Sequence, residues 1–197
     1  AMVEMVDRQI GEIIALLKEL NIDDNTIIFV SGDNGGRTYF ANENHPHGFL
    51  APNLNPKTGE RFRGGKGNFY EGGIRVPFIV RWPGKIKAGS VSDHLGYFPD
   101  VMPTIAEITG AIPRKDSDGI SIVPTLLGAE KAGRKQEQHE YLYWESRKSI
   151  ALRMNNWKAI KPSTKAPFEL YDLSKDIEEL HDVAAQYPEI IEKMKKY

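Results

Sequence analysis

Two short polar clusters, each rich in glycine, carry the residue types needed for chemistry on an anion. The first cluster, residues 31–36 (SGDNGG), follows directly after the apolar run 26–30. The second, residues 64–73 (GGKGNFYEGG), places Lys66 between glycines. An acid–amide pair at the end of a strand can hold a hard cation, and a lysine on an uncrowded backbone can approach an anion closely. Together the clusters predict chemistry on a negatively charged ester.

The acid–amide pair of the first cluster is Asp33 and Asn34. Their carboxylate and amide oxygens are hard donors that suit Ca²⁺ or Mg²⁺. Gly35 and Gly36 allow a sharp turn, so both side chains could converge on one ion at the end of a strand. The alternative is a plain tight turn, because Asn-Gly is a common hairpin signal. Ca²⁺ takes about six to eight oxygens, so further ligands must come from substrate, water or other sequence.

The second cluster offers an ammonium group, at Lys66, and backbone N–H groups that could face an anion. Its spacing, and the lack of a Ser or Thr after the lysine, exclude a P-loop. The alternative is a solvated lysine in a turn. Glu71 could pair locally with Lys66 or have a structural role. His45 and His47 lie in a long loop, where each could bind substrate, ligate a metal or simply occupy the surface.

Composition sets limits on the class of protein. A chain of 197 residues can bury one core, or a core with a small satellite subdomain. The net charge is −1 and both signs are mixed along the chain, so the sequence does not indicate a basic surface for binding nucleic acid or an anionic membrane. No apolar stretch approaches the roughly 20 residues that cross a bilayer. Cysteine is absent, which excludes disulfides, thiolate metal sites and cysteine nucleophiles in this chain.

Hydrophobic periodicity predicts an α/β arrangement for the first part of the chain. Apolar residues recur at helical spacing from Val3 to Leu20, and the run 26–30 then reads as a buried parallel strand. Residues 37–62 form a long loop of a length that is usually functional or disordered. The sequence further predicts a second buried strand over 76–82 and a helix over 94–109. A connector over 111–138 should contain a short element at 122–127.

The pattern of apolar and polar residues changes after about residue 139. Four short, partly alternating runs separated by turn signals predict a small antiparallel sheet, at residues 141–145, 149–154, 157–161 and 168–172. A helix over 188–196 should turn Ile190, Ile191 and Met194 inward. The predicted division is therefore a main α/β part (1–110), a connector (111–138) and an antiparallel subdomain (139–197).

Taken in order, these segments resemble the type I sulfatases of the alkaline phosphatase superfamily. The resemblance covers nearly the whole chain and is carried by MVEMVDRQIGEIIALLKELNIDDNTIIFVSGDNGG, FRGGKGNFYEGGIRVPFIVRWPGKI, DHLGYFPDVMPTIAEITG, NNWKAIKP and FELYDLSKDIEELHDVAAQYPEI. It implies part of an alkaline-phosphatase-like α/β sandwich, with a small C-terminal antiparallel β subdomain and a terminal helix. It also implies hydrolysis of sulfate esters.

The resemblance assigns roles to three residues. Asp33 and Asn34 match the pair that binds the divalent cation of the family, usually calcium, with Mg²⁺ as the alternative. Lys66 matches the lysine that contacts the sulfate group or the bridging oxygen. The family's nucleophile is a formylglycine hydrate, made from Cys or Ser in a C/S-x-P-x-R signature. It attacks sulfur, the alcohol leaves, and the sulfated intermediate then eliminates sulfate.

The C/S-x-P-x-R signature does not occur in this sequence, and the match begins part-way through the family pattern. The sequence is therefore interpreted as the C-terminal portion of a sulfatase, with no nucleophile in this chain and no turnover by it alone. An apolar edge left without its N-terminal strands should favour oligomerisation. The parent is expected to be periplasmic or secreted, although no signal peptide is visible in this chain.

Two alternatives accompany the sulfatase interpretation. The first is a phosphonate or phosphodiester hydrolase of the same superfamily, which can share the metal pair. The second is a non-catalytic carbohydrate-binding module built on Trp144, Trp157 and the long loop. For the sulfatase, a sulfated carbohydrate or an aryl sulfate is the expected substrate, and neither a nucleic acid nor a membrane span is expected.

Overall fold

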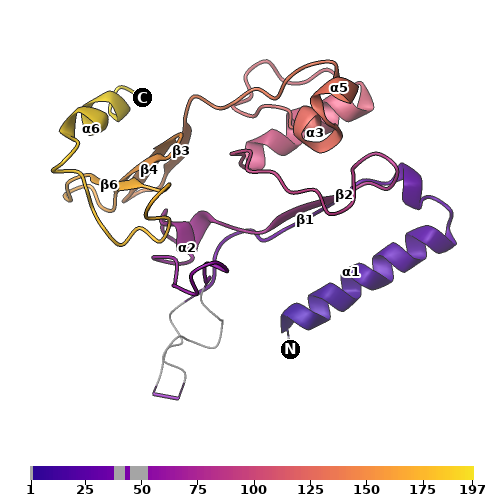
Figure 1. The fold of residues 1–197 in the computed structure, drawn as a ribbon, viewed down its shortest axis with the longest axis horizontal. Coiled ribbons are helices and arrows are strands. Elements are labelled where there is room, and N and C mark those ends of the chain that lie inside the picture. The colour runs from indigo at the N-terminus through magenta and orange to yellow at the C-terminus, as the bar shows by residue number, and fades with distance from the viewer. Residues whose placement is uncertain (1, 38–42, 45–52) are drawn as a thin grey trace. The chain divides into compact units, whose positions relative to one another are not determined.

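The computed structural model describes residues 2–37, 43–44 and 53–197. The chain divides into two compact units, each made of two segments (Figure 1). The first unit comprises Ala1–Val30 and Phe78–His139. The second unit comprises Ser31–Pro77 and Glu140–Tyr197, so it contains both glycine clusters together with the C-terminal part of the chain.

The first unit begins with the amphipathic helix predicted from the sequence. Helix α1 runs over Met2–Glu19, and Asn21 in the left-handed conformation follows it. A short 3₁₀ turn, η1 (Asp23–Asn25), leads into the next strand. The guanidinium of Arg81 bonds both carboxylate oxygens of Asp23, at 2.6 and 2.9 Å, which joins this turn to the far end of the second strand.

Strands β1 (Ile28–Ser31) and β2 (Phe78–Arg81) form a two-stranded sheet. The prediction that both are buried strands is wrong for the structure described. The apolar residues of β1 are only half-buried, and Phe78 and Ile79 are exposed. Among the described residues this sheet has two strands, too few to enclose either of them as a strand buried on both faces, despite their strand-forming residue types.

The predicted helix over 94–109 begins later than expected. A 3₁₀ turn, η2 (Phe98–Asp100), precedes α3 (Val101–Thr109). The buried carboxylate of Asp100 accepts hydrogen bonds from the backbone N–H groups of Tyr97 (3.0 Å) and Ile120 (2.8 Å), which fixes a non-helical approach to the helix. The short element expected at 122–127 is α4 (Val123–Leu127), and α5 (Ala129–Ala132), which follows it, was not predicted.

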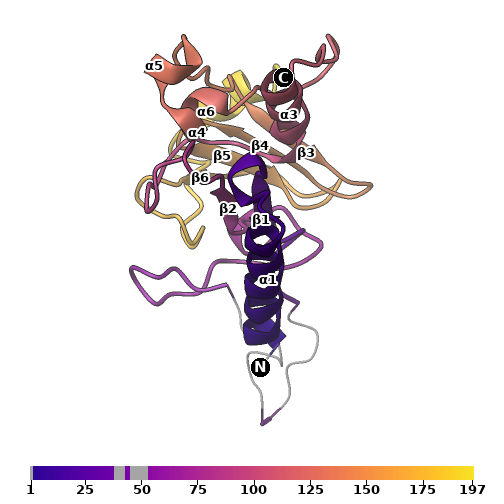
Figure 2. The ribbon, with the colours of Figure 1, turned by 90° about the vertical axis from the view of Figure 1, so that its right-hand side faces the viewer.

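The second unit contains the antiparallel sheet that the alternating runs predicted. Its strands follow the order β3-β4-β5-β6, and Figure 2 shows them side by side. The strands are β3 (Leu142–Glu145), β4 (Ile150–Met154), β5 (Trp157–Lys161) and β6 (Glu169–Asp172). Helix α6 (Pro188–Met194) closes the chain, and a single-turn helix, α2 (Glu71–Ile74), follows the lysine segment.

Both faces of this sheet are covered by parts of the same unit. On one face, α6 packs Ile191 and Met194 against a buried cluster that includes Leu170, with Ile190 partly buried beside it. On the other face, Tyr70 packs with a second cluster that includes Tyr171. The predicted inward orientation of the helix is therefore confirmed. Successive residues of a strand point to opposite faces of the sheet. Residues at both odd and even positions are therefore buried, in one cluster or the other.

No helix in the described part of the chain combines the length and apolar character that a membrane span requires.

Candidate active site

The acid–amide pair lies where β1 ends. Asp33 Oδ1 accepts hydrogen bonds from the backbone N and the side-chain Nδ2 of Asn34, both at 3.0 Å. Asp33 is exposed and Asn34 is half-buried. With its amide nitrogen directed at Asp33, Asn34 keeps its carbonyl oxygen as a hard donor. The two side chains are therefore in direct contact, with the amide nitrogen of Asn34 facing the carboxylate of Asp33.

Hydrogen bonds join the two glycine clusters, which are about thirty residues apart in sequence. The backbone N–H of Gly35 donates to the carbonyl of Gly73 (2.9 Å), and that of Lys66 donates to the carbonyl of Gly36 (2.9 Å). A Cβ atom on Gly35 would lie 1.7 Å from the carbonyl oxygen of Gly72. This approach requires glycine, because no side chain fits between the two backbones.

Lys66 lies on a tight turn that its own cluster builds. Asn68 N donates to the carbonyl of Gly65 (3.2 Å), and Gly65 N donates back to Asn68 Oδ1 (3.3 Å). The flanking Gly64 and Gly67 have φ angles of +76° and +98°, which favour glycine. The turn holds the half-buried Lys66 beside the segment that carries the acid–amide pair.

The donor set at Asp33 and Asn34 fits part of a calcium or magnesium site. Both side chains offer hard oxygens, and two oxygens make up only a fraction of either coordination shell. In the described residues there is no group of three or more His, Cys, Asp or Glu that could hold a metal ion. The remaining predicted site residues, His45 and His47, lie outside the described residues.

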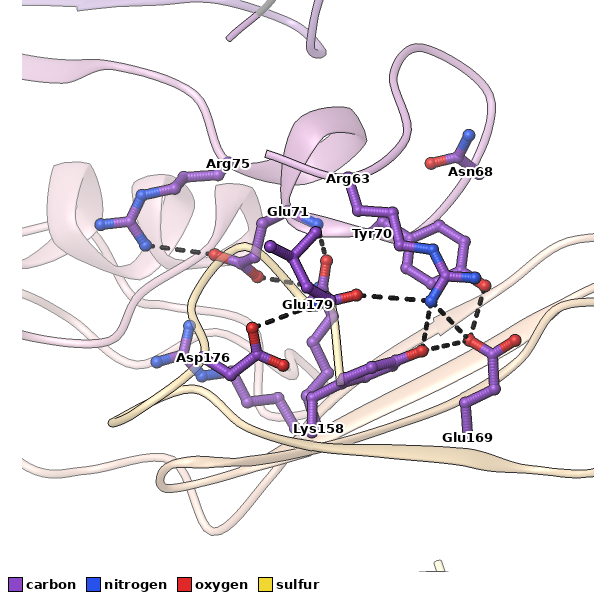
Figure 3. A network of polar contacts seen from close by, with 12 residues as sticks. Arg63, Asn68, Tyr70, Glu71, Arg75, Lys158, Glu169, Asp176 and Glu179 are labelled. Atoms are coloured by element: carbon purple, nitrogen blue, oxygen red, sulfur yellow. Dashed lines mark hydrogen bonds and ion pairs between the residues drawn. The ribbon is translucent and has the colours of Figure 1, made fainter. Parts of the chain in front are cut away.

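A buried ion network, absent from the sequence predictions, supports the lysine segment (Figure 3). Lys158 on β5 is 0 % exposed, and its Nζ lies 2.8 Å from Glu71 Oε1 and 2.8 Å from Glu179 Oε1. The backbone N–H of Glu71 donates to Glu179 Oε2 (2.5 Å). Burial would raise the pKa of Glu71, but the Lys158 ammonium outweighs it and the net pKa is lowered. Of the two roles considered for Glu71, the structural one is therefore observed.

Arg63 makes a second connection between this segment and the sheet (Figure 3). Its guanidinium lies over the Tyr70 ring, 4.2 Å from the centroid, and 3.3 Å from Glu169 Oε2. Glu169 also accepts hydrogen bonds from the hydroxyls of Tyr70 (2.7 Å) and Tyr171 (2.6 Å). Burial raises the pKa of both tyrosines, so they stay neutral donors at physiological pH.

These contacts attach the lysine segment to β5, β6 and the turn that holds Glu179. The sequence contained one signal for them, a lysine between apolar neighbours in the run 157–161. A charged side chain inside a buried strand needs a partner, because an unpaired buried charge is strongly destabilising. The partners Glu71 and Glu179 could not be chosen from spacing, since neither is a local sequence neighbour of Lys158.

Comparisons with known proteins connect this geometry to a family. The family model described as "Sulfatase" matches residues 1–111, and that described as "N-sulphoglucosamine sulphohydrolase, C-terminal" matches residues 59–197. This chain belongs to the sulfatase family. The resemblance seen in the sequence is thereby confirmed, including its assignment to the C-terminal portion. Asp33, Asn34 and Lys66 fall within the first match.

Individual relatives of this sulfatase chain include both sequences and solved structures. The N-acetylgalactosamine-6-sulfatase of Canis lupus familiaris is 33% identical over 80% of the chain and 27% of its own length. The crystal structure of Ps i-CgsB with k-i-k-neocarrahexaose has a TM-score of 0.75 and 32% identity, covering 98% of the chain and 40% of that protein. The phosphonate monoester hydrolase of Agrobacterium radiobacter has a TM-score of 0.67 and 26% identity, covering 96% and 37%.

The chain therefore spans well under half the length of these relatives. The predicted α/β class with an alkaline-phosphatase-like fold is confirmed by these structures.

Proposed function

We propose that Asp33, Asn34 and Lys66 form the cation-binding and sulfate-binding part of the active site of a sulfatase. The observation that carries this proposal is the pair of backbone hydrogen bonds between the two glycine clusters, from Gly35 to Gly73 and from Lys66 to Gly36. They join the backbone of the segment that carries the hard-oxygen pair to the backbone of the segment that carries Lys66. That combination suits an ester whose oxygens carry negative charge.

Each residue has a distinct chemical task in this proposal. Asp33 and Asn34 would hold the divalent cation, Ca²⁺ or else Mg²⁺, with further ligands from outside this pair. A bound cation supplies Lewis-acid stabilisation of the negative oxygens on the transferring group. Lys66 would donate hydrogen bonds from its ammonium group to the sulfate or to the oxygen that bridges sulfur and carbon. The formylglycine nucleophile would lie outside this sequence, which has no C/S-x-P-x-R signature.

The proposed substrate is a sulfated carbohydrate. Support comes from the relatives, one named for N-acetylgalactosamine 6-sulfate and one crystallised with a carrageenan hexasaccharide. A periplasmic or secreted location for the whole protein would match such substrates. The exposed apolar side chains of α1, such as Ile13 and Leu16, are consistent with association through the first unit. Sedimentation velocity of this chain would measure that association.

The test measures hydrolysis of two classes of ester, and the effect of replacing Lys66. It uses the complete protein encoded by the reading frame that contains this sequence, with 4-nitrophenyl sulfate and bis(4-nitrophenyl) phosphate as substrates. We expect a higher kcat/KM for the sulfate, and a loss of about 10²- to 10³-fold in Lys66→Ala, as for removal of a transition-state donor. Lys193→Ala, an exposed lysine on α6, is the control and should retain full activity. A Lys66→Ala protein that hydrolyses the sulfate normally would overturn the proposal.

A phosphonate or phosphodiester hydrolase is the second candidate. The similarity to the phosphonate monoester hydrolase favours it, because the same cation and lysine could bind a phosphoryl group. A clear preference for bis(4-nitrophenyl) phosphate in the same assay would replace the first proposal by this one.

The non-catalytic carbohydrate module receives less support. Trp144 and Trp157, on which it would depend, pack against the two buried clusters of the second unit, and Trp157 also contacts the ring of Tyr187 at 5.1 Å. Their half-buried positions favour a structural role.

A further inference from the structure

A tight turn of the C-terminal sheet presents two neighbouring basic side chains. Arg147 and Lys148 form the tip of the turn between β3 and β4. Ser146 and Ser149 close this turn, since Ser146 N donates to the carbonyl of Ser149 (2.9 Å) and the two hydroxyl oxygens lie 2.9 Å apart. The turn therefore has a defined backbone shape beneath two exposed cationic groups.

These two charges have no acidic partner in the part of the chain that the structure describes. Within residues 2–37, 43–44 and 53–197, neither Arg147 nor Lys148 forms an ion pair. The acid nearest in sequence, Glu145, accepts a hydrogen bond from the hydroxyl of Tyr143 (2.9 Å). Two adjacent cations without a partner create a local positive potential, which favours binding of an anion.

The two basic residues line a cavity of about 400 Å³. This volume falls in the range of about 300–1,000 Å³ that is common for small-molecule sites. Gly67 and Asn68 line the same cavity. Gly67 follows Lys66 directly, and consecutive Cα atoms are about 3.8 Å apart. The cavity thus begins one residue away from the lysine assigned to the sulfate ester.

The remaining walls suit a sugar ring. Phe69 and Pro162 provide apolar surface, while Asn68 is held in place by the hydrogen bond from Gly65 N to its Oδ1. Ligand sites commonly combine apolar walls with a few placed polar groups. A saccharide has both apolar C–H surfaces and polar substituents. With Arg147 and Lys148 at the rim, the matching ligand is a saccharide that carries an anion.

We infer that this cavity is a subsite for a second sulfate group, on the same saccharide whose sulfate ester lies at Lys66. The Arg147 guanidinium and the Lys148 ammonium bind the second sulfate, and Phe69 contacts the sugar ring. Arginine suits this role because its planar fork can donate two parallel hydrogen bonds to the oxygens of one anion. The inference rests on the proposed function of Lys66, and it makes the disulfated saccharide the preferred ligand.

The test titrates this chain with two probes at one fixed ionic strength. D-Glucosamine 2-N,6-O-disulfate carries two sulfates, and N-acetyl-D-glucosamine 6-sulfate carries one. By calorimetry, the unchanged chain should bind the disulfate about tenfold more tightly, the size expected for charge-assisted hydrogen bonds to a second anion. The double variant Arg147→Ala/Lys148→Ala should lose this preference.

A second double variant controls for net charge. Lys193→Ala/Lys196→Ala removes two exposed lysines from the C-terminal end of the same unit, so both double variants change the net charge equally. The control should keep the tenfold preference. Backbone amide chemical shifts of residues 146–149 should move with the disulfate and stay unchanged with the monosulfate.

The outcomes separate this inference from the proposed function. Equal affinities of the unchanged chain for both probes, no binding of the disulfate, or a preference that survives Arg147→Ala/Lys148→Ala would each overturn the subsite. Monosulfate binding that is unaffected by Lys66→Ala would instead count against the proposed role of Lys66. In that case, a disulfate preference that still depends on Arg147 and Lys148 would support the cavity as an anion site.

Discussion

In the second unit most apolar side chains of the central strands and of α6 lie in two buried clusters, whereas in the first unit many of those of α1 are exposed. Leu170 on β6 is 0 % exposed, and Leu16 on α1 is 52 % exposed. Both residues occupy regular elements whose apolar spacing predicted a buried face. The second unit covers both faces of its sheet, whereas neither buried cluster found among the described residues includes a side chain of α1.

The ion pairs of the two units also differ in how deeply they are buried. Lys158 in the second unit is fully buried between two carboxylates, and the Asp23–Arg81 pair of the first unit remains partly accessible to water. The buried network joins the lysine segment to the sheet, so the second unit positions Lys66. This contrast leads us to expect mutational effects on the free energy of unfolding to be large in the second unit and small in the first.

The largest effect is expected from removing the buried ammonium group. Lys158→Met leaves the buried Glu179 without its cation and Glu71 with Arg75 alone, 3.1 Å away, and should lower the free energy of unfolding by about 3–5 kcal/mol. Urea titration followed by circular dichroism measures this value. The triple variant Lys158→Met/Glu71→Gln/Glu179→Gln removes the charges of all three buried residues and should recover most of the loss. A Lys158→Met protein as stable as the unchanged chain would contradict the structural role of the network.

A matched pair of leucine substitutions compares the units directly. Leu170→Ala removes a buried side chain and should lower the free energy of unfolding by about 2–5 kcal/mol. Leu16→Ala, at an exposed helix position, should change it by no more than about 0.5 kcal/mol. The same urea titration serves for both variants. Similar losses would mean that α1 is packed in solution, by self-association or otherwise, and the dependence of the loss on protein concentration would identify association.

Two glycine substitutions should act in opposite directions. Gly35→Ala places a Cβ atom 1.7 Å from the carbonyl oxygen of Gly72 and should destabilise the second unit by about 1–3 kcal/mol or more. Gly11→Ala lies inside α1 with no atom within 4 Å of the added Cβ, and should stabilise the helix by about 0.5–1 kcal/mol. Thermal unfolding measures both changes. A tolerated Gly35→Ala would show that the two glycine clusters do not approach each other closely.

The smallest effect concerns the partly accessible ion pair. The hydrogen bond from Arg81 holds the pKa of the Asp23 carboxyl below its ordinary value of 3.8. A lowered folded-state pKa gives stability that is present above the unfolded value and is lost as pH falls through the folded value. The relevant window therefore lies below about pH 4. Carbon-13 NMR titration should show this lowered pKa, and Arg81→Met should return it toward 3.8.

The effect of salt provides a second comparison of the exposed and buried carboxyls. Since surface pairs are screened, 1 M NaCl should reduce the pKa shift of Asp23, whereas the lowered pKa of the buried Glu71 should change little. Equal salt sensitivity of the two carboxyls would contradict the difference in burial.

Sequence periodicity predicted most elements of the second unit. The alternating runs became β3 to β6, and the inward residues of α6 were identified because a 3.6-residue pattern fixes which face is apolar. The failures have local causes. The helix at 94–109 begins late because Asp100 binds backbone groups on both sides of it. Ile79 is exposed in a sheet that has two strands within the described residues.

The sequence predicted the residues of the candidate site, but it did not predict the contacts that hold the lysine segment in place. Asp33, Asn34 and Lys66 were selected from two local clusters, and their roles remain proposals. Local spacing could not identify Glu179 or Glu169, because hydrogen bonds over about a hundred residues depend on chain topology. The cavity beside Lys66 was likewise not foreseen, since Arg147 and Lys148 read as an ordinary polar turn.

The sequence by itself determined the residue chemistry of this protein and its membership of the sulfatase family. The absence of cysteine excluded thiol chemistry. The local order of apolar and polar residues predicted most helix and strand segments, because these depend largely on neighbouring residues. The tertiary structure alone decided which distant groups meet. It brought Gly35 against Gly72, buried Lys158 between two carboxylates, and placed Arg147 and Lys148 on the cavity next to Lys66. Those contacts arise from packing between segments far apart in sequence, where periodicity carries no information.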